Sequence, residues 1–183
     1  MSGKKSKNKG KLFEREIANF LSDLYGESFT RVPYSGAFVG GKNAVRKEHL
    51  DEAQIRGFKS DIIPPAEWSK LNVECKHYAD FPFHALLRPK DIPLLDQWIA
   101  QTYDAADDGD FNLIIMKFNR LGRFVMFEKE ASLRKVGQQV HLATSYHYAY
   151  YKDWIMMDFD TFWLANKSLV KELSHSSWTS TKR

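Results

Sequence analysis

The 183-residue sequence predicts an α/β fold, a mixed and largely antiparallel central sheet with helices on its faces. Apolar side chains recur at helical spacing over 12–25 and 92–106, which predicts two amphipathic helices. Residues 112–118 form instead a continuous apolar run, the pattern of a strand that is covered on both faces. A hydrophobic content of 43% is sufficient for one domain with a real core.

Between the first helix and the central strand, shorter segments predict the other strands of the N-terminal half. Residues 28–32 are strand-like and lead into a turn at 33–37. A short apolar run at 61–63 turns at two prolines and can return as a neighbouring strand over 72–76. The two runs are therefore expected to form a hairpin.

The C-terminal half begins with an irregular, proline-containing segment over 77–93. Residues 123–127 are interpreted as the antiparallel partner of the central strand, and 162–173 as a last helix. The region 141–165 is rich in Tyr, Trp and Phe but has few basic residues among them. A core or dimer face is therefore favoured over a surface on which DNA bases stack.

Charge and cysteine content narrow the class of protein. A net charge of +4 and a pI of about 9.0 indicate a polyanionic partner, with the basic residues concentrated locally. Residues 1–10 are expected to be a disordered basic arm, 11–173 one domain with a flexible basic insert at 38–59, and 174–183 a polar tail. A single cysteine excludes an internal disulfide, and without a signal peptide or long apolar run the expected location is the cytoplasm of a prokaryotic or phage-infected cell.

The chemically informative stretch is 60–76. Because strand side chains alternate, Glu74 and Lys76 share one face, and the hairpin brings the Asp61 carboxylate beside them. Two carboxylates in one cluster are costly unless a divalent cation lies between them. Oxygen-only ligation suits Mg²⁺, with Mn²⁺ as a substitute, and Lys76 remains to polarise a water or contact a phosphoryl oxygen. The alternative is an exposed strand edge with alternating charge.

Five motifs follow one another in a specific order: Lys9-Gly10, Glu14-Arg15-Glu16-Ile17, residues 31–36 (RVPYSG), Asp61-Ile62-Ile63 and Glu74-Cys75-Lys76. In this order the sequence resembles the archaeal-type Holliday junction resolvases and their phage relatives, within the PD-(D/E)XK nuclease superfamily. The resemblance covers residues 9 to about 118. The long insert at 38–59 departs from the pattern.

The resemblance implies a site. Asp61, Glu74, Glu14 and the main-chain carbonyl of Cys75 would hold the metal ion, while the Cys75 side chain faces the core. Lys76 would orient the attacking water or neutralise the phosphate, and Ser35 would contact the scissile phosphate. A glutamine of the 92–106 helix, Gln97 or Gln101, is a further candidate, although a solvated helix face is the favoured interpretation of both. The DNA-binding candidates are Arg15, Arg31, Ser35, Lys4, Lys5, Lys7, Lys9, Lys11, Lys42, Arg46 and Lys47.

Two of these residues have structural alternatives. Glu14 is also what the dipole favours in the first turn of a helix, and Arg15 can instead pair with Glu16 or Asp61. The lysines of residues 1–10 also have an alternative interpretation, in which they form a solubilising tail and do not contact DNA.

The function expected from the resemblance is a Mg²⁺-dependent endodeoxyribonuclease that resolves four-way DNA junctions by paired symmetric nicks. Symmetric cleavage requires two sites in fixed relation, which a homodimer supplies. The alternatives are another PD-(D/E)XK nuclease of restriction, nicking or recombination type, and a DNA-binding protein without catalysis.

Overall fold

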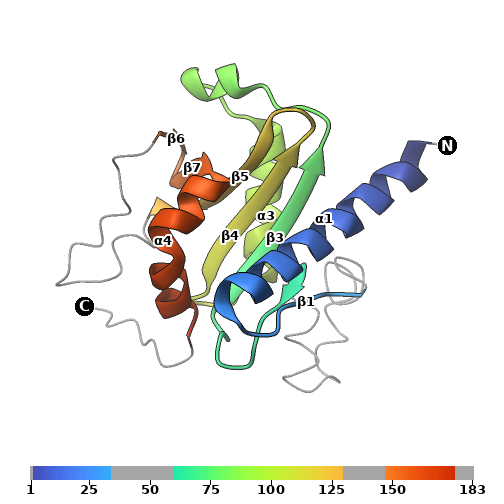
Figure 1. Ribbon diagram of the computed structural model, residues 1–183. Helices are drawn as coiled ribbons and strands as arrows, with labels where there is room; N and C mark the ends of the chain where they lie inside the picture. The colour runs from blue at the N-terminus through green and yellow to red at the C-terminus, as the bar shows by residue number, and fades with distance from the viewer. Residues whose placement is uncertain (1, 34–59, 130–146, 176–183) are drawn as a thin grey trace.

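The computed structural model describes residues 2–33, 60–129 and 147–175, and these form a central sheet with helices on both faces (Figure 1). The sheet has five strands in the order β3-β4-β5-β7-β6. Their bounds are Leu71–Tyr78 (β3), Phe111–Phe118 (β4), Gly122–Glu128 (β5), Tyr148–Tyr151 (β6) and Trp154–Asp158 (β7). β3 runs parallel to β4, and the remaining pairs are antiparallel. The expected mixed α/β architecture is confirmed.

Helices cover both faces of the sheet. α1 (Ser2–Tyr25) and α4 (Phe159–Ser174) pack on one face, and α3 (Pro93–Ala105) with the short 3₁₀ helix η2 (Phe83–Leu87) packs on the other. Because strand side chains alternate, each strand supplies both cores. On β4, for example, Leu113 and Ile115 face α1 and α4, whereas Ile114 and Met116 face α3. All four are fully buried, as expected for a strand covered on both sides.

A second, two-stranded sheet lies outside β3. β1 (Thr30–Arg31) pairs antiparallel with β2 (Ile62–Ile63). The expected hairpin is therefore corrected in one respect, because the ladder partner of β2 is β1 rather than β3. Asp61 still reaches β3, since its main-chain N–H donates to the Val73 carbonyl at 3.0 Å.

α1 begins earlier than its apolar pattern indicates. Its backbone is helical from Ser2, through the residues for which the sequence predicts a disordered arm. Lysine is a good helix former, and extending an existing helix costs much less than starting one. Figure 1 shows the first turns of α1 pointing away from the sheet at the β3 edge.

The aromatic-rich region contributes a β6–β7 hairpin that its composition alone does not predict. Aromatic side chains favour strands as well as cores and interfaces. The chain reverses at Lys152, which has a φ of 53°. A lysine seldom adopts this left-handed conformation, so the sequence does not predict the turn. The following helix α4 starts at Phe159, earlier than expected, because Asp158 caps it by accepting from the Thr161 N–H at 2.9 Å.

Among the described helices, none has the combination of length and apolar character that crossing a bilayer requires.

Candidate active site

The outer edge of β3 carries an acidic residue and a basic residue that contact each other directly. Lys76 Nζ lies 2.6 Å from Glu74 Oε1, and both side chains are mostly buried. The same Nζ donates to Oε1 of Gln101 on α3, also at 2.6 Å. Lys76 is thus held between a carboxylate of its own strand and an amide of the neighbouring helix.

Asp61 is fixed against β3 by two hydrogen bonds. Besides the main-chain bond to Val73, its Oδ2 accepts from the Cys75 N–H at 2.8 Å. Only 7% of Asp61 is exposed. The N–H and C=O of one strand residue point to the same edge, so the Cys75 carbonyl lies on the Asp61 side of β3. The Cys75 side chain is buried in the core beneath α1, as expected.

Glu14 reaches the same edge from α1. Its Oε2 accepts from Arg31 Nε at 2.7 Å, and the pair is well shielded from solvent. Gly10 lies one helical turn earlier, where an added Cβ would stand 3.8 Å from Glu14 Oε1. A side chain at position 10 would therefore be in contact with the Glu14 carboxylate.

The three carboxylates influence one another. Burial, and then the charge of Asp61, raise the pKa of Glu74 to about 7, and Lys76 offsets only part of this rise. Burial and Asp61 also raise the pKa of Glu14, against the opposing effect of Arg31. The pKa of the Cys75 thiol is raised well above its ordinary value, chiefly by burial, so the thiol stays protonated. The cluster has more negative charge than its own cations neutralise.

This excess charge is the observation that bears on a metal ion. The donors are carboxylate and carbonyl oxygens, the set that Mg²⁺ prefers. In the described ranges, however, no three His, Cys, Asp or Glu side chains already converge on one point as a metal site. Glu14 and Glu74 are instead turned towards Arg31 and Lys76. The residues fit a hard divalent cation by donor type and charge, and binding it requires these ion pairs to rearrange.

A family model described as "Phage putative PDDEXK endonuclease" matches residues 5–172, which is most of the chain. The chain belongs to this family. The match includes the whole Glu14, Asp61, Glu74 and Lys76 cluster and supports nuclease activity on DNA. Searches of curated proteins and of solved structures found no match.

The site residues expected from the sequence of this phage-type endonuclease fall into three groups in the structure. Glu14, Asp61, Glu74, Lys76 and the Cys75 main chain come together at the β3 edge. Arg15, Lys9 and Lys11 are exposed on α1, outside that cluster. Ser35, Lys42, Arg46 and Lys47 lie outside the described residues, as do the side chains of Lys4, Lys5 and Lys7.

The structure adds two contacts that the phage endonuclease sequence did not reveal. Arg31, expected on the substrate side, is engaged with Glu14 and with the Pro33 carbonyl at 3.4 Å. Of the two candidate glutamines, Gln101 contacts Lys76, whereas Gln97 is exposed one turn earlier on α3. Helical spacing places both on related faces, and only the packing angle of α3 on β3 distinguishes them.

Proposed function

We propose that the protein is a metal-dependent endodeoxyribonuclease whose active site is the outer edge of β3. The observation that supports this most strongly is the grouping of Glu14 and Asp61 near Glu74, which itself contacts Lys76, with raised pKa values for both glutamates. A strand edge of purely structural charges would gain nothing from burying three acids together.

Asp61, Glu74, Glu14 and the Cys75 carbonyl are the proposed ligands, for Mg²⁺ or for Mn²⁺ in its place. When bound, such an ion lowers the pKa of a bound water and neutralises charge that develops on the phosphoryl group. The chain itself keeps the ligands in place: Asp61 donates one hydrogen bond to β3 and accepts another from it, and α1 presents Glu14.

Lys76 is proposed to orient the attacking water and to neutralise a phosphoryl oxygen. This role requires the Lys76 ammonium to be held in one orientation, and hydrogen bonds to Gln101 and Glu74 hold it from two sides. With Glu74 serving as a metal ligand, Gln101 would be the remaining one of these two contacts to hold Nζ.

Replacing Gln101 with Leu is therefore expected to lower the cleavage rate about tenfold, since a hydrogen bond to a charged group is lost. Gln97→Leu, one turn earlier on the same helix, is the matched control and should leave the rate unchanged. Steady-state cleavage of a fluorescent DNA substrate measures both. Equal rates for the two variants would show that Gln101 does not position Lys76 for cleavage.

The proposed substrate is branched DNA, and in particular the four-way junction, cut by a homodimer. The first support is the order of the five sequence motifs. The second is the position of Glu14 close to Asp61, because an acidic residue from a helix is not part of the minimal Asp…Glu-x-Lys pattern. Arg15, Ser35 and the basic residues of α1 and of the 38–59 insert are the proposed phosphate contacts. The Arg31 side chain is only 17% exposed, and its contact with Glu14 favours a supporting role.

Incubation with Mg²⁺ and three substrates tests this proposal: an immobile four-way junction, a flap and a linear duplex of matching sequence. We expect paired symmetric nicks in the junction at a rate at least about 10²-fold above that for the linear duplex. Equal cutting of all three would leave a nuclease of the family without junction selectivity.

The ion pairs of Glu14 and Glu74 favour one alternative, a DNA-binding protein in which these acids are structural. A metal titration distinguishes the two. If the thermal midpoint does not respond to Mg²⁺ or Mn²⁺ and no substrate is cut, the alternative is correct.

A further inference from the structure

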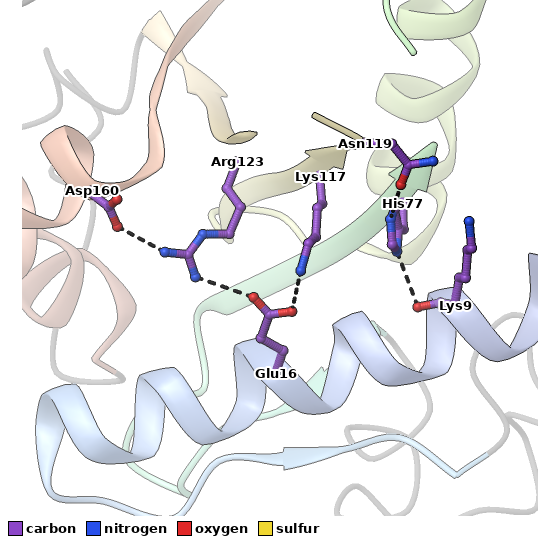
Figure 2. Close-up of polar contacts among 7 residues, drawn as sticks. All are labelled: Lys9, Glu16, His77, Lys117, Asn119, Arg123 and Asp160. Atoms are coloured by element: carbon purple, nitrogen blue, oxygen red, sulfur yellow. Dashed lines mark hydrogen bonds and ion pairs between the residues drawn. The ribbon is translucent and has the colours of Figure 1, made fainter. Parts of the chain in front are cut away.

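Glu14 and Glu16 are two residues apart on α1 but point to opposite flanks of the helix, because two residues turn an α-helix by about 200°. Glu14 contacts Arg31 at the β3 edge. Glu16 faces the β4–β5 hairpin, where a polar network joins α1 to β4 and β5, and through Arg123 to α4 (Figure 2). Ionic contacts therefore hold this turn of α1 from both sides.

Glu16 is the centre of this network. Its Oε2 accepts from Lys117 Nζ at 2.7 Å, and its Oε1 lies 3.4 Å from Arg123 Nη1. Arg123 also reaches Asp160 at the start of α4, at 3.0 Å. One carboxylate thus links α1 to two adjacent strands, and through Arg123 to the second helix of the same face.

The two cations are themselves held by aromatic rings. Lys117 Nζ stands 5.5 Å from the ring centre of Phe13, which precedes Glu14 on α1. The Arg123 guanidinium lies 4.2 Å from the ring centre of Phe159. The Phe13 contact is a second link between β4 and α1, and Phe159 restrains Arg123 from the side of α4, so the network resists rotation and sliding of α1.

A third contact fixes α1 one to two turns earlier. The Nδ1–H of His77 donates to the Lys9 carbonyl at 3.4 Å, and its Nε2 lies 3.1 Å from Oδ1 of Asn119 (Figure 2). His77 follows Lys76 directly on β3. The strand that carries Glu74 and Lys76 is therefore also tied to the helix that carries Glu14.

These contacts matter because the apolar packing of α1 acts mainly perpendicular to the sheet. Phe13, Ile17 and Leu21 are fully buried and hold the helix down. Directional contacts determine where along the strand edge the Glu14 carboxylate stands, and a ligand must be placed to within a fraction of an ångström to act.

We propose that Glu16 is a positioning residue that, with Lys117 and Arg123, sets the place of Glu14 at the β3 edge. This inference rests on the proposed nuclease function. Glu16, Lys117 and Arg123 are each about one-third exposed at the side chain, with values of 38%, 34% and 29%. Partly exposed ion pairs add little to stability, so the main consequence of losing them is expected in the site.

The test compares Glu16→Gln with Asp23→Asn, which removes the same charge from an exposed position of α1. Glu16→Gln should weaken Mg²⁺ binding about tenfold by calorimetry in the absence of DNA, and lower kcat about tenfold with KM for junction DNA unchanged. Lys117→Met should do the same, and combining the two should cost less than the product of their separate effects. Asp23→Asn should match wild type in every measurement.

Several outcomes would overturn the proposal. A change in KM alone would make the network a DNA contact, and values equal to those of Asp23→Asn would make it a passive surface. Loss of folded protein at the assay temperature in both network variants would make it a stability element. An inactive wild type that does not bind Mg²⁺ would refute the proposed function and this inference together, whereas an active wild type with unaffected variants would refute the inference alone.

Discussion

Asp61→Asn and Glu74→Gln are each expected to lower the rate of DNA cleavage by about 10³-fold or more, since each removes one of the charges proposed to hold the metal ion. Both substitutions preserve shape. The amide that Asp61→Asn introduces keeps an oxygen that accepts from the Cys75 N–H, the contact that ties Asp61 to β3. Both variants should therefore lose activity while keeping the fold, which circular dichroism and thermal unfolding check.

DNA binding by the same two variants, measured by fluorescence anisotropy in chelator, should equal or exceed that of wild type. Removing a carboxylate relieves its repulsion with the phosphates. Glu67→Gln, at an exposed position between β2 and β3, is the matched control and should alter neither quantity. If the Asp61 and Glu74 variants bind DNA clearly more weakly, these acids are structural.

The second large effect is a dependence of stability on pH. Without metal, the free energy of unfolding should fall by about 1–3 kcal/mol as pH rises from about 5 to about 8. The folded state retains the Glu74 proton up to a pKa of about 7, whereas the unfolded chain releases it near the ordinary value of 4.5. Over this range the folded state binds more protons, so raising pH favours unfolding.

Glu74→Gln separates this contribution from the rest of the titration. The variant should be more stable than wild type at pH 8, because it no longer buries a charge, and close to wild type at pH 5. Denaturant titrations at the two pH values measure the difference, with Glu67→Gln as control. A wild-type stability that is flat or rises over this range would contradict the assigned pKa shift.

Magnesium should reverse the trend. Because the metal ion competes with the Glu74 proton, its affinity is expected to increase as pH rises through about 7, and the stabilisation that it confers increases with it. The cleavage rate should rise over the same range. The two opposing slopes, one without metal and one with it, are a signature that a purely structural Glu74 would not produce.

Local patterns predict the elements that depend on burial. The continuous apolar run of β4 and the helical stripes of α1 and α3 are recognisable because a core demands a period in the sequence. The Glu74–Lys76 pair follows from strand alternation alone. Asp61 is connected to it by the expected turn at the two prolines. Glu14 can be connected to it only through the order of motifs, because no local pattern relates a residue of the first helix to Glu74.

Where a contact depends on the turn geometry or on the angle between elements, the sequence alone is insufficient. The Lys152 turn of the β6–β7 hairpin, the pairing of β2 with β1, and the helical backbone of 2–10 all differ from expectation. Each depends on neighbours that are distant in sequence or on a conformation that no residue type announces.

The sequence by itself thus determined the nuclease superfamily through the order of its motifs, and the fold class through the fixed backbone periods of strands and helices. Only the tertiary structure decided that Arg31 pairs with Glu14, that Gln101 and not Gln97 holds Lys76, and that Glu16 links α1 to β4 and β5. These contacts join side chains across separate elements, and their partners are chosen by how the elements pack and not by any local pattern.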